Sequence, residues 1–177
     1  MPGCIDMLRA EHRSVEAALQ ALLQLLGSAR ARASRPIPEL LWAMVDAVRS
    51  PAAAQHHSKE EVLFRLLRAR APELGAELDE LSRHHLRNPC LIGAVVDAVE
   101  RYCGGAATQE ELEWAIETYV KFLREHMRRE ETLILPAAEQ NLTESDWQEI
   151  HAVAQAHRDL ESRETNGSSV LLIQAER

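Results

Sequence analysis

Residues 108–136, TQEELEWAIETYVKFLREHMRREETLILP, carry the pattern that decides the fold. Apolar residues recur there every three or four positions, which predicts one amphipathic helix with a single buried face. Thr108 followed by Glu111 is a capping box, so we expect the helix to begin at Thr108 and to run towards Pro136. The predicted buried face consists of Leu112, Ala115, Tyr119, Phe122, Leu123, Leu133 and Ala137.

The same period of 3.6 residues recurs along most of the chain. It predicts further helices over residues 5–30, 38–70, 73–102 and 143–163. Ser50-Pro51 should kink the second helix or restart it with Ser50 as the N-cap, and Pro89 should interrupt the third. Four long amphipathic helices with short connections favour an all-α, up-down four-helix bundle, followed by a short additional C-terminal helix. We expect one domain over residues 1–163 and a tail over 164–177.

Composition narrows the class of protein. With 177 residues, the chain is long enough for one domain with a proper core. Its net charge of −8 argues against a nucleic-acid partner, and no apolar run is long enough to span a membrane. Three widely separated cysteines suggest neither a disulfide framework nor a thiolate zinc site. The first residues lack the apolar run of a signal peptide, so we expect a cytoplasmic protein.

Several ionisable residues share the angle of the apolar stripes. At about 100° per residue, each of the four long helices directs polar groups into the core. These residues are His12, His56, Glu60, His85, His126 and Glu130. By the same angles, His57, Glu61 and Glu131 should point outward, and His84 should lie at the edge of its stripe. A kink at Pro51 would change the angles in the second helix, so the pattern leaves open whether His57 or Glu61 replaces its neighbour as the inward-facing residue.

Burying six ionisable side chains without partners would cost several kcal/mol for each unpaired charge, which a domain of ordinary stability could not absorb. Metal cations would neutralise the carboxylates and use the imidazole lone pairs. The spacings His56-x-x-x-Glu60 and His126-x-x-x-Glu130 place an imidazole and a carboxylate one turn apart on an inward face. Mixed nitrogen and oxygen ligation suits iron, and also manganese or zinc. Taken singly, each histidine is explained as well by a hydrogen bond to the backbone; their joint inward placement favours a two-metal site.

These residues resemble the hemerythrin-like, or HHE cation-binding, family. The resemblance covers roughly residues 4–142 and rests on LRAEH (8–12), HHSKEEVLF (56–64), His85 and HMRREETLILP (126–136). It implies a four-helix bundle around a non-haem di-iron centre with bridging carboxylates. The implied ligands are His12, His56, Glu60, His85, His126 and Glu130.

The chain departs from the oxygen-carrying hemerythrins at two points. Their third helix supplies two histidines one turn apart, whereas here Leu81 and Pro89 stand one turn before and after His85. Their last helix supplies an Asp five residues after its His, whereas here Glu130 follows His126 by four residues. The pattern is similar to that of hemerythrin-like domains with four His and two Glu, some of which sense iron or oxygen.

Three functions follow as hypotheses. The first is a di-iron protein that senses or binds O₂, NO or iron, with a small ligand as its partner and a homodimer as one compatible assembly. The second is a di-iron oxidase or peroxidase-like enzyme. The Glu-x-x-His pair of ferritin-type oxidases occurs nowhere in the chain, which counts against that version. The third is a scaffold for a partner helix, with a single zinc or no metal.

Overall fold

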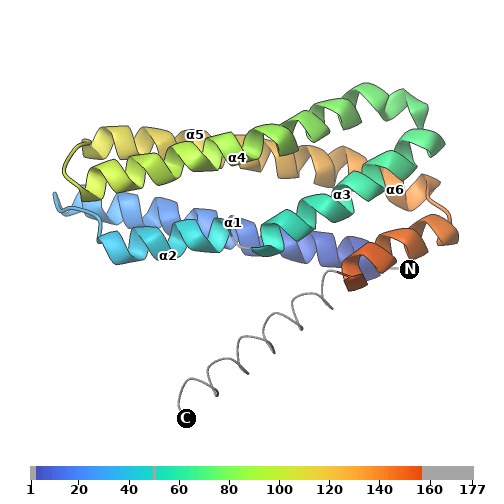
Figure 1. The fold of residues 1–177 in the computed structure, drawn as a ribbon, viewed down its shortest axis with the longest axis horizontal. Helices are drawn as coiled ribbons and strands as arrows, with labels where there is room; N and C mark the ends of the chain where they lie inside the picture. Colours follow the sequence, from blue (N-terminus) through green and yellow to red (C-terminus); the bar gives the residue numbers. More distant parts are fainter. Residues whose placement is uncertain (1–2, 50, 157–177) are drawn as a thin grey trace, which may run out of the picture.

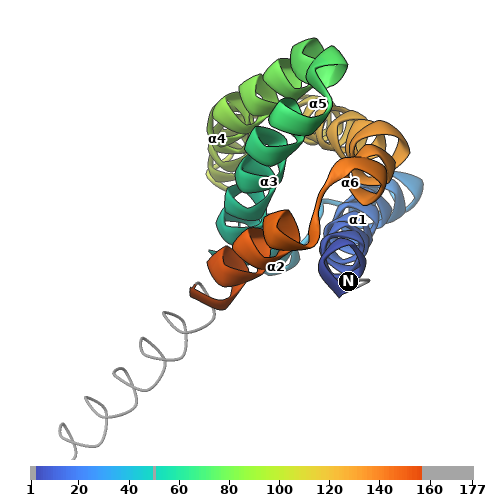
Figure 2. The same ribbon diagram turned by 90° about the vertical axis from the view of Figure 1, so that its right-hand side faces the viewer.

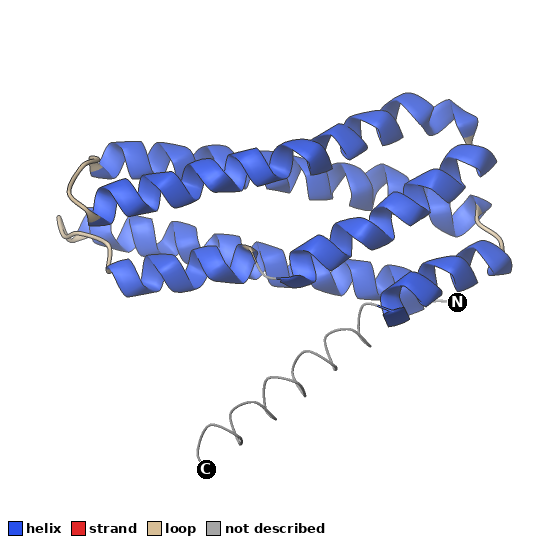
Figure 3. Ribbon diagram, viewed as in Figure 1, coloured by secondary structure: helices blue, strands red, loops and turns tan. Residues whose placement is uncertain are grey.

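A computed structural model describes residues 3–49 and 51–156, and within these ranges the chain forms helices joined by turns and no strand (Figure 3). The predicted all-α class is therefore confirmed. The elements are α1 (Gly3–Ala31), α2 (Pro38–Val48), α3 (Pro51–Arg70), η1 (Pro72–Leu74), α4 (Gly75–Cys103), α5 (Gln109–Arg129), η2 (Glu130–Ile134) and α6 (Leu135–Asn141), followed by a helix over residues 144–156.

The helices form four long antiparallel arms (Figure 1). The first arm is α1, the second is α2 with α3, the third is α4, and the fourth is α5 with η2 and α6. The first arm packs on the second and fourth, and α4 packs on α2, α3 and α5. Viewed from the end, the arms surround a common interior, and the helix over residues 144–156 crosses one end of the bundle (Figure 2). This is the expected up-down bundle with a short additional helix.

The two internal prolines act differently. The second arm is restarted, because α2 ends at Val48 and α3 begins at Pro51. The predicted interruption at Pro89 is wrong, since α4 continues through it. Pro89 cannot donate to the carbonyl of His85, yet α4 stays helical through it and packs against α2, α3 and α5. The N-cap role of Ser50, the helix end at residue 163 and the tail over 164–177 lie outside the described residues.

The predicted capping box is present at the start of α5. The Glu111 N–H donates to the Thr108 hydroxyl over 3.2 Å, and the Thr108 N–H donates to the Glu111 carboxylate over 2.7 Å. We expect Thr108→Ala to lower the free energy of unfolding by about 1 kcal/mol. Urea unfolding checks this, with Thr118→Ala on the exposed face of α5 as the control. An equal loss in both variants would contradict the capping role.

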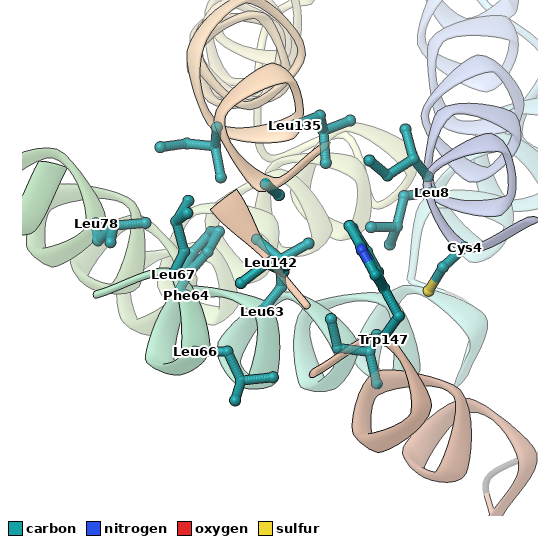
Figure 4. Packing of buried hydrophobic residues seen from close by; sticks show 14 of the residues in the cluster. Cys4, Leu8, Leu63, Phe64, Leu66, Leu67, Leu78, Leu135, Leu142 and Trp147 are labelled. Atoms are coloured by element: carbon teal, nitrogen blue, oxygen red, sulfur yellow. The ribbon is translucent and has the colours of Figure 1, made fainter. Parts of the chain in front are cut away.

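The hydrophobic core is divided into two clusters. One contains the start of α1, the second half of α3, the start of α4, α6 and the last described helix; Figure 4 shows residues of this cluster, among them Phe64 and Trp147. The other lies at the opposite end of the bundle, between α1, α2, α4 and α5. Along α1, for example, Leu8 belongs to the first cluster and Leu19 to the second. The layer between the clusters is polar.

A π-helical turn, η2, interrupts the fourth arm. The Leu135 N–H donates to the carbonyl of Glu130, five residues back. Pro136 has no N–H to offer the carbonyl four residues before it, which favours this wider turn. The extra residue shifts the register, so the expectation that Leu133 is buried is wrong: it is 41% exposed, and Ile134 and Leu135 are buried instead. π-turns of this kind are frequent at functional sites.

Candidate metal centre

The six predicted site residues come together in the polar layer between the two apolar clusters. They come from every arm of the bundle: His12 from α1, His56 and Glu60 from α3, His85 from α4, His126 from α5 and Glu130 from η2. None of these side chains is more than 9% exposed. The helix angles therefore placed all six correctly on inward faces.

The two carboxylates share their oxygens between two sets of imidazoles. Glu60 Oε1 lies 2.8 Å from His56 Nε2 and 3.4 Å from His12 Nε2, while Glu60 Oε2 lies 3.3 Å from His85 Nε2. Glu130 Oε2 lies 3.3 Å from His12 Nε2, while its Oε1 lies 3.3 Å from His126 Nε2. Each glutamate thus presents one oxygen to each set, which is the arrangement of a carboxylate that bridges two cations.

His57 also lies in this layer, contrary to its predicted outward direction. Its ring stacks on that of His85, with centroids 4.2 Å apart and planes 24° apart. The predicted directions assumed one helix over residues 38–70, whereas α3 begins afresh at Pro51. Angles measured from α2 therefore do not give the directions of side chains on α3. Two successive residues of α3, His56 and His57, therefore both reach the layer.

Three outer carboxylates orient the histidines. Oxygens of Glu11, Glu61 and Glu131 lie 2.7, 2.6 and 3.0 Å from the Nδ1 atoms of His56, His85 and His12 respectively. A carboxylate accepts, so each Nδ1 carries a proton and each Nε2 points inward, where it can bind a cation once it has no proton. Outer carboxylates of this kind are typical of histidines that bind metals.

Sequence reasoning missed these outer partners. Glu61 and Glu131 are about half-exposed, which agrees with their predicted outward direction, yet their carboxylates reach back to a histidine on another helix. The signal was present in the doublets Glu60-Glu61 and Glu130-Glu131. In each doublet, the first carboxylate points into the polar layer. The second lies outside this layer and accepts a hydrogen bond from a histidine ring.

A buried lysine accompanies one outer carboxylate. Lys59 is 5% exposed and donates from Nζ to Glu11, which also accepts from His56. Burial alone would raise the pKa of Glu11, but the hydrogen bonds from His56 and Lys59 lower it below its usual value. Glu11 therefore stays charged beside His56.

The buried carboxylates and imidazoles of the layer favour binding of a cation. Both oxygens of Glu130 and Oε2 of Glu60 are buried, and none completes a well-directed hydrogen bond with the described residues. Burial and the charge of Glu60 raise the pKa of Glu130 to about 7. Burial lowers the pKa of His126 to about 2, so its imidazole is neutral, and its Nε2 lies 3.2 Å from His85 Nε2. Buried carboxylate oxygens without hydrogen bonds beside a neutral imidazole suit metal binding.

The side chains that could bind metal lie within the part of the chain that matches a cation-binding family. Two sets of side chains could each hold a metal ion: His12, His56, Glu60 and Glu130, and His57, Glu60, His85 and His126. A family model, the hemerythrin HHE cation binding domain, matches residues 4–138. The chain belongs to the hemerythrin HHE family. The match runs from α1 into α6 and includes every residue of both groups.

Neither a search of curated proteins nor a search of solved structures found a match to this hemerythrin-family chain. None of its described helices combines the length and apolar character needed to cross a membrane.

The outer carboxylates of this hemerythrin-type site can be tested through Glu61, which holds His85 and accepts from Ser82. We expect Glu61→Ala to weaken metal binding by about 10–100-fold. Because the side chain is about half-exposed, the fold should be unaffected. Competition with a coloured chelator measures the affinity, and Glu80→Ala on the exposed face of α4 is the control. Equal affinity in both variants would contradict the orienting role.

Proposed function

We propose that this chain holds two iron ions in the polar layer and uses them to sense or bind a small ligand such as O₂ or NO. The observation that carries this proposal is the division of the Glu60 and Glu130 oxygens between two sets of imidazoles. A single cation would leave one oxygen of each buried carboxylate without a partner. The proposed ligands are His12, His56, Glu60, His85, His126 and Glu130.

The donor set supports iron over softer metals. Nitrogen and oxygen donors surround the site, whereas Cys4 packs in an apolar cluster and the other two cysteines are exposed. Manganese and zinc accept the same donors, so the identity of the ions is part of the proposal. When bound, iron supplies reversible electron transfer and coordination positions for a small molecule.

A small enclosed cavity beside the site supports a diatomic ligand. Its volume is about 30 Å³, and its walls include His12, His57 and His126. The remaining walls are mostly apolar, apart from His56 and from Asn88 and Tyr119, which hydrogen-bond each other. A void of this size holds a water molecule or a diatomic gas and excludes larger substrates. This favours gas binding over turnover of an organic substrate.

Compartment and assembly are also part of the proposal. No disulfide joins Cys4, Cys90 and Cys103, which suits a reducing compartment such as the cytoplasm. The homodimer stays a prediction, and light scattering with purified protein tests it.

Metal analysis and optical spectroscopy on freshly purified protein test the function. We expect two iron ions per chain and near-ultraviolet charge-transfer bands that bleach on anaerobic reduction. Admission of O₂ or NO should then change the spectrum stoichiometrically and reversibly. Sustained consumption of O₂ or peroxide would favour the oxidase or peroxidase alternative, and a colourless protein with zinc or no metal would overturn the proposal.

A further inference from the structure

We propose that a surface groove between α1 and α5 is the route by which a small neutral or anionic molecule reaches the polar layer, and that Met127 is the gate on this route. This inference rests on the proposed function, because it concerns the entry of the small ligand. Neither Met127 nor Arg13, the two residues tested below, is a proposed metal ligand.

The groove ends at the buried site. It has a volume of about 280 Å³ and is lined by residues of α1, α5 and η2. One wall is His12, which is only 2% exposed. The enclosed cavity of about 30 Å³ beside the site has two walls in common with this groove, His12 and Met127. These two side chains therefore stand between the groove and the cavity.

Of the two shared walls, Met127 is the one that can move. The His12 ring is held on both sides, because its Nδ1 lies 3.0 Å from Glu131 and its Nε2 lies 3.4 Å from Glu60 and 3.3 Å from Glu130. Met127 belongs to an apolar cluster and is 8% exposed. Its side chain is unbranched and flexible, so a change of rotamer can open a passage without movement of a helix.

Volume alone does not mark the route. Two larger hollows on the surface, of about 610 and 520 Å³, have no potential metal ligand among the described residues of their walls. The smaller groove between α1 and α5 reaches His12, which belongs to one of the two groups that could hold a metal ion. Its position, rather than its size, therefore connects it with the site.

The charges of the groove set the class of ligand. Its charged walls, apart from His12, are three arginines and two glutamates: Arg13, Arg124, Arg128, Glu16 and Glu131. Arg124 pairs with Glu16 and Arg128 pairs with Glu125, whereas no carboxylate of a described residue lies within ion-pairing distance of Arg13. Such a lining attracts small anions, admits neutral molecules and disfavours cations. The cavity behind it limits the ligand to a few atoms.

Rates of NO and azide binding to the iron-loaded protein test the gate. A gate that is open for about 10% of the time or less slows entry and exit alike. We expect Met127→Ala to raise the association and dissociation rates of both ligands by the same factor, about tenfold or more. The Kd and the optical spectrum should stay unchanged, whereas a purely structural role would change them. Met127→Phe should slow both rates.

Val15→Ala is the matched control, because Val15 lines the cavity but is not a wall of the groove. It also removes apolar volume, yet it should leave both rates near those of the wild type. Helix content by circular dichroism verifies folding, and Met127→Val replaces Met127→Ala if that variant does not fold.

Arg13→Glu tests the charge of the route. We expect it to slow azide association by up to about tenfold at low salt and to leave the association rate of NO unchanged, because NO has no charge. The difference between the two ligands should shrink as salt is added. Equal effects on azide and NO would contradict steering by Arg13.

Thiol labelling of the metal-free chain tests the route without metal. Cys90 and Cys103 are exposed, so both are first replaced by Ser. In that background, Met127→Cys should react faster with a negatively charged methanethiosulfonate reagent than with a positively charged one, and Arg13→Glu should reverse this order. Absence of labelling, or equal rates with the two reagents, would overturn the groove as the route.

Failure of the gate differs from failure of the proposed function. If the wild type binds NO or azide and Met127→Ala has the same rates, the gate is overturned and the proposed function stands. A changed Kd or spectrum in Met127→Ala, without a matched rise in both rates, also overturns the gate. If the iron-loaded wild type binds neither ligand, the proposed function and the gate both fall.

Discussion

Replacing Glu60 by Gln is expected to remove both metal ions, because the two oxygens of this one side chain face the two sets of imidazoles. The amide keeps the shape of the carboxylate but loses its charge and one acceptor. We expect metal affinity to fall by more than the ~10–100-fold typical of outer-shell changes. The thermal stabilisation that metal gives should disappear with it, because binding to the folded state alone is folding free energy.

Elemental analysis and thermal unfolding with and without metal measure both effects. The matched control is Glu61→Gln, the next residue, which contacts only His85 among the imidazoles and should retain both ions with weaker affinity. If Glu60→Gln retains one ion firmly, Glu60 does not bridge. If both variants retain two, the site assignment is wrong.

Opposite responses of the metal-free and metal-loaded protein to pH are the second large effect. In the metal-free chain, burial alone would lower the pKa of His12 and His56, but the carboxylates beside them raise it. Glu130 and Glu60 raise the pKa of His12 to about 10, and Glu60 and Glu11 raise the pKa of His56 to about 9. Both pKa values exceed that of an unfolded histidine, about 6.5. Stability from these pairs is therefore fully present below pH 6.5 and is lost as pH rises through 9 to 10.

Metal binding has the opposite sign. Protons must leave His12 and His56 before their nitrogens can bind a cation, so affinity should rise with pH, by up to about tenfold per pH unit for each proton displaced. We expect the midpoint of thermal unfolding in the presence of a chelator to fall between pH 6.5 and 9. Over the same range, the increase in midpoint on adding metal should grow. Parallel pH profiles with and without metal would contradict the role of these histidines.

The outer carboxylates explain how a half-exposed residue can affect a buried centre. Glu61 and Glu131 reach the layer from outside, and each fixes the ring of a histidine on a different helix. Glu11 does the same for His56 and is itself held by Lys59. Orientation of the rings therefore depends on contacts between helices, and the order of the arms decides which carboxylate serves which histidine.

Local periodicity determined the helices and the inward faces. The capping box at Thr108 and Glu111 and the inward placement of His12, Glu60 and Glu130 follow from residues within one or two turns of each other, so the sequence alone predicted them. A break at Pro51 was also predicted, as a kink or a restart, and the structure has the restart. Such features depend on the geometry of a single helix, which is the same wherever that helix packs.

Contacts between arms were decided only by the tertiary structure. The division of each carboxylate between two sets of imidazoles and the approach of His57 to His85 depend on how α1, α3, α4 and α5 meet. The burial of Ile134 in place of Leu133 depends on a π-turn that a constant angle per residue does not include. Helix period gives the direction of a side chain about its own axis, whereas the partner it meets is set by the depth, tilt and register of the neighbouring helix.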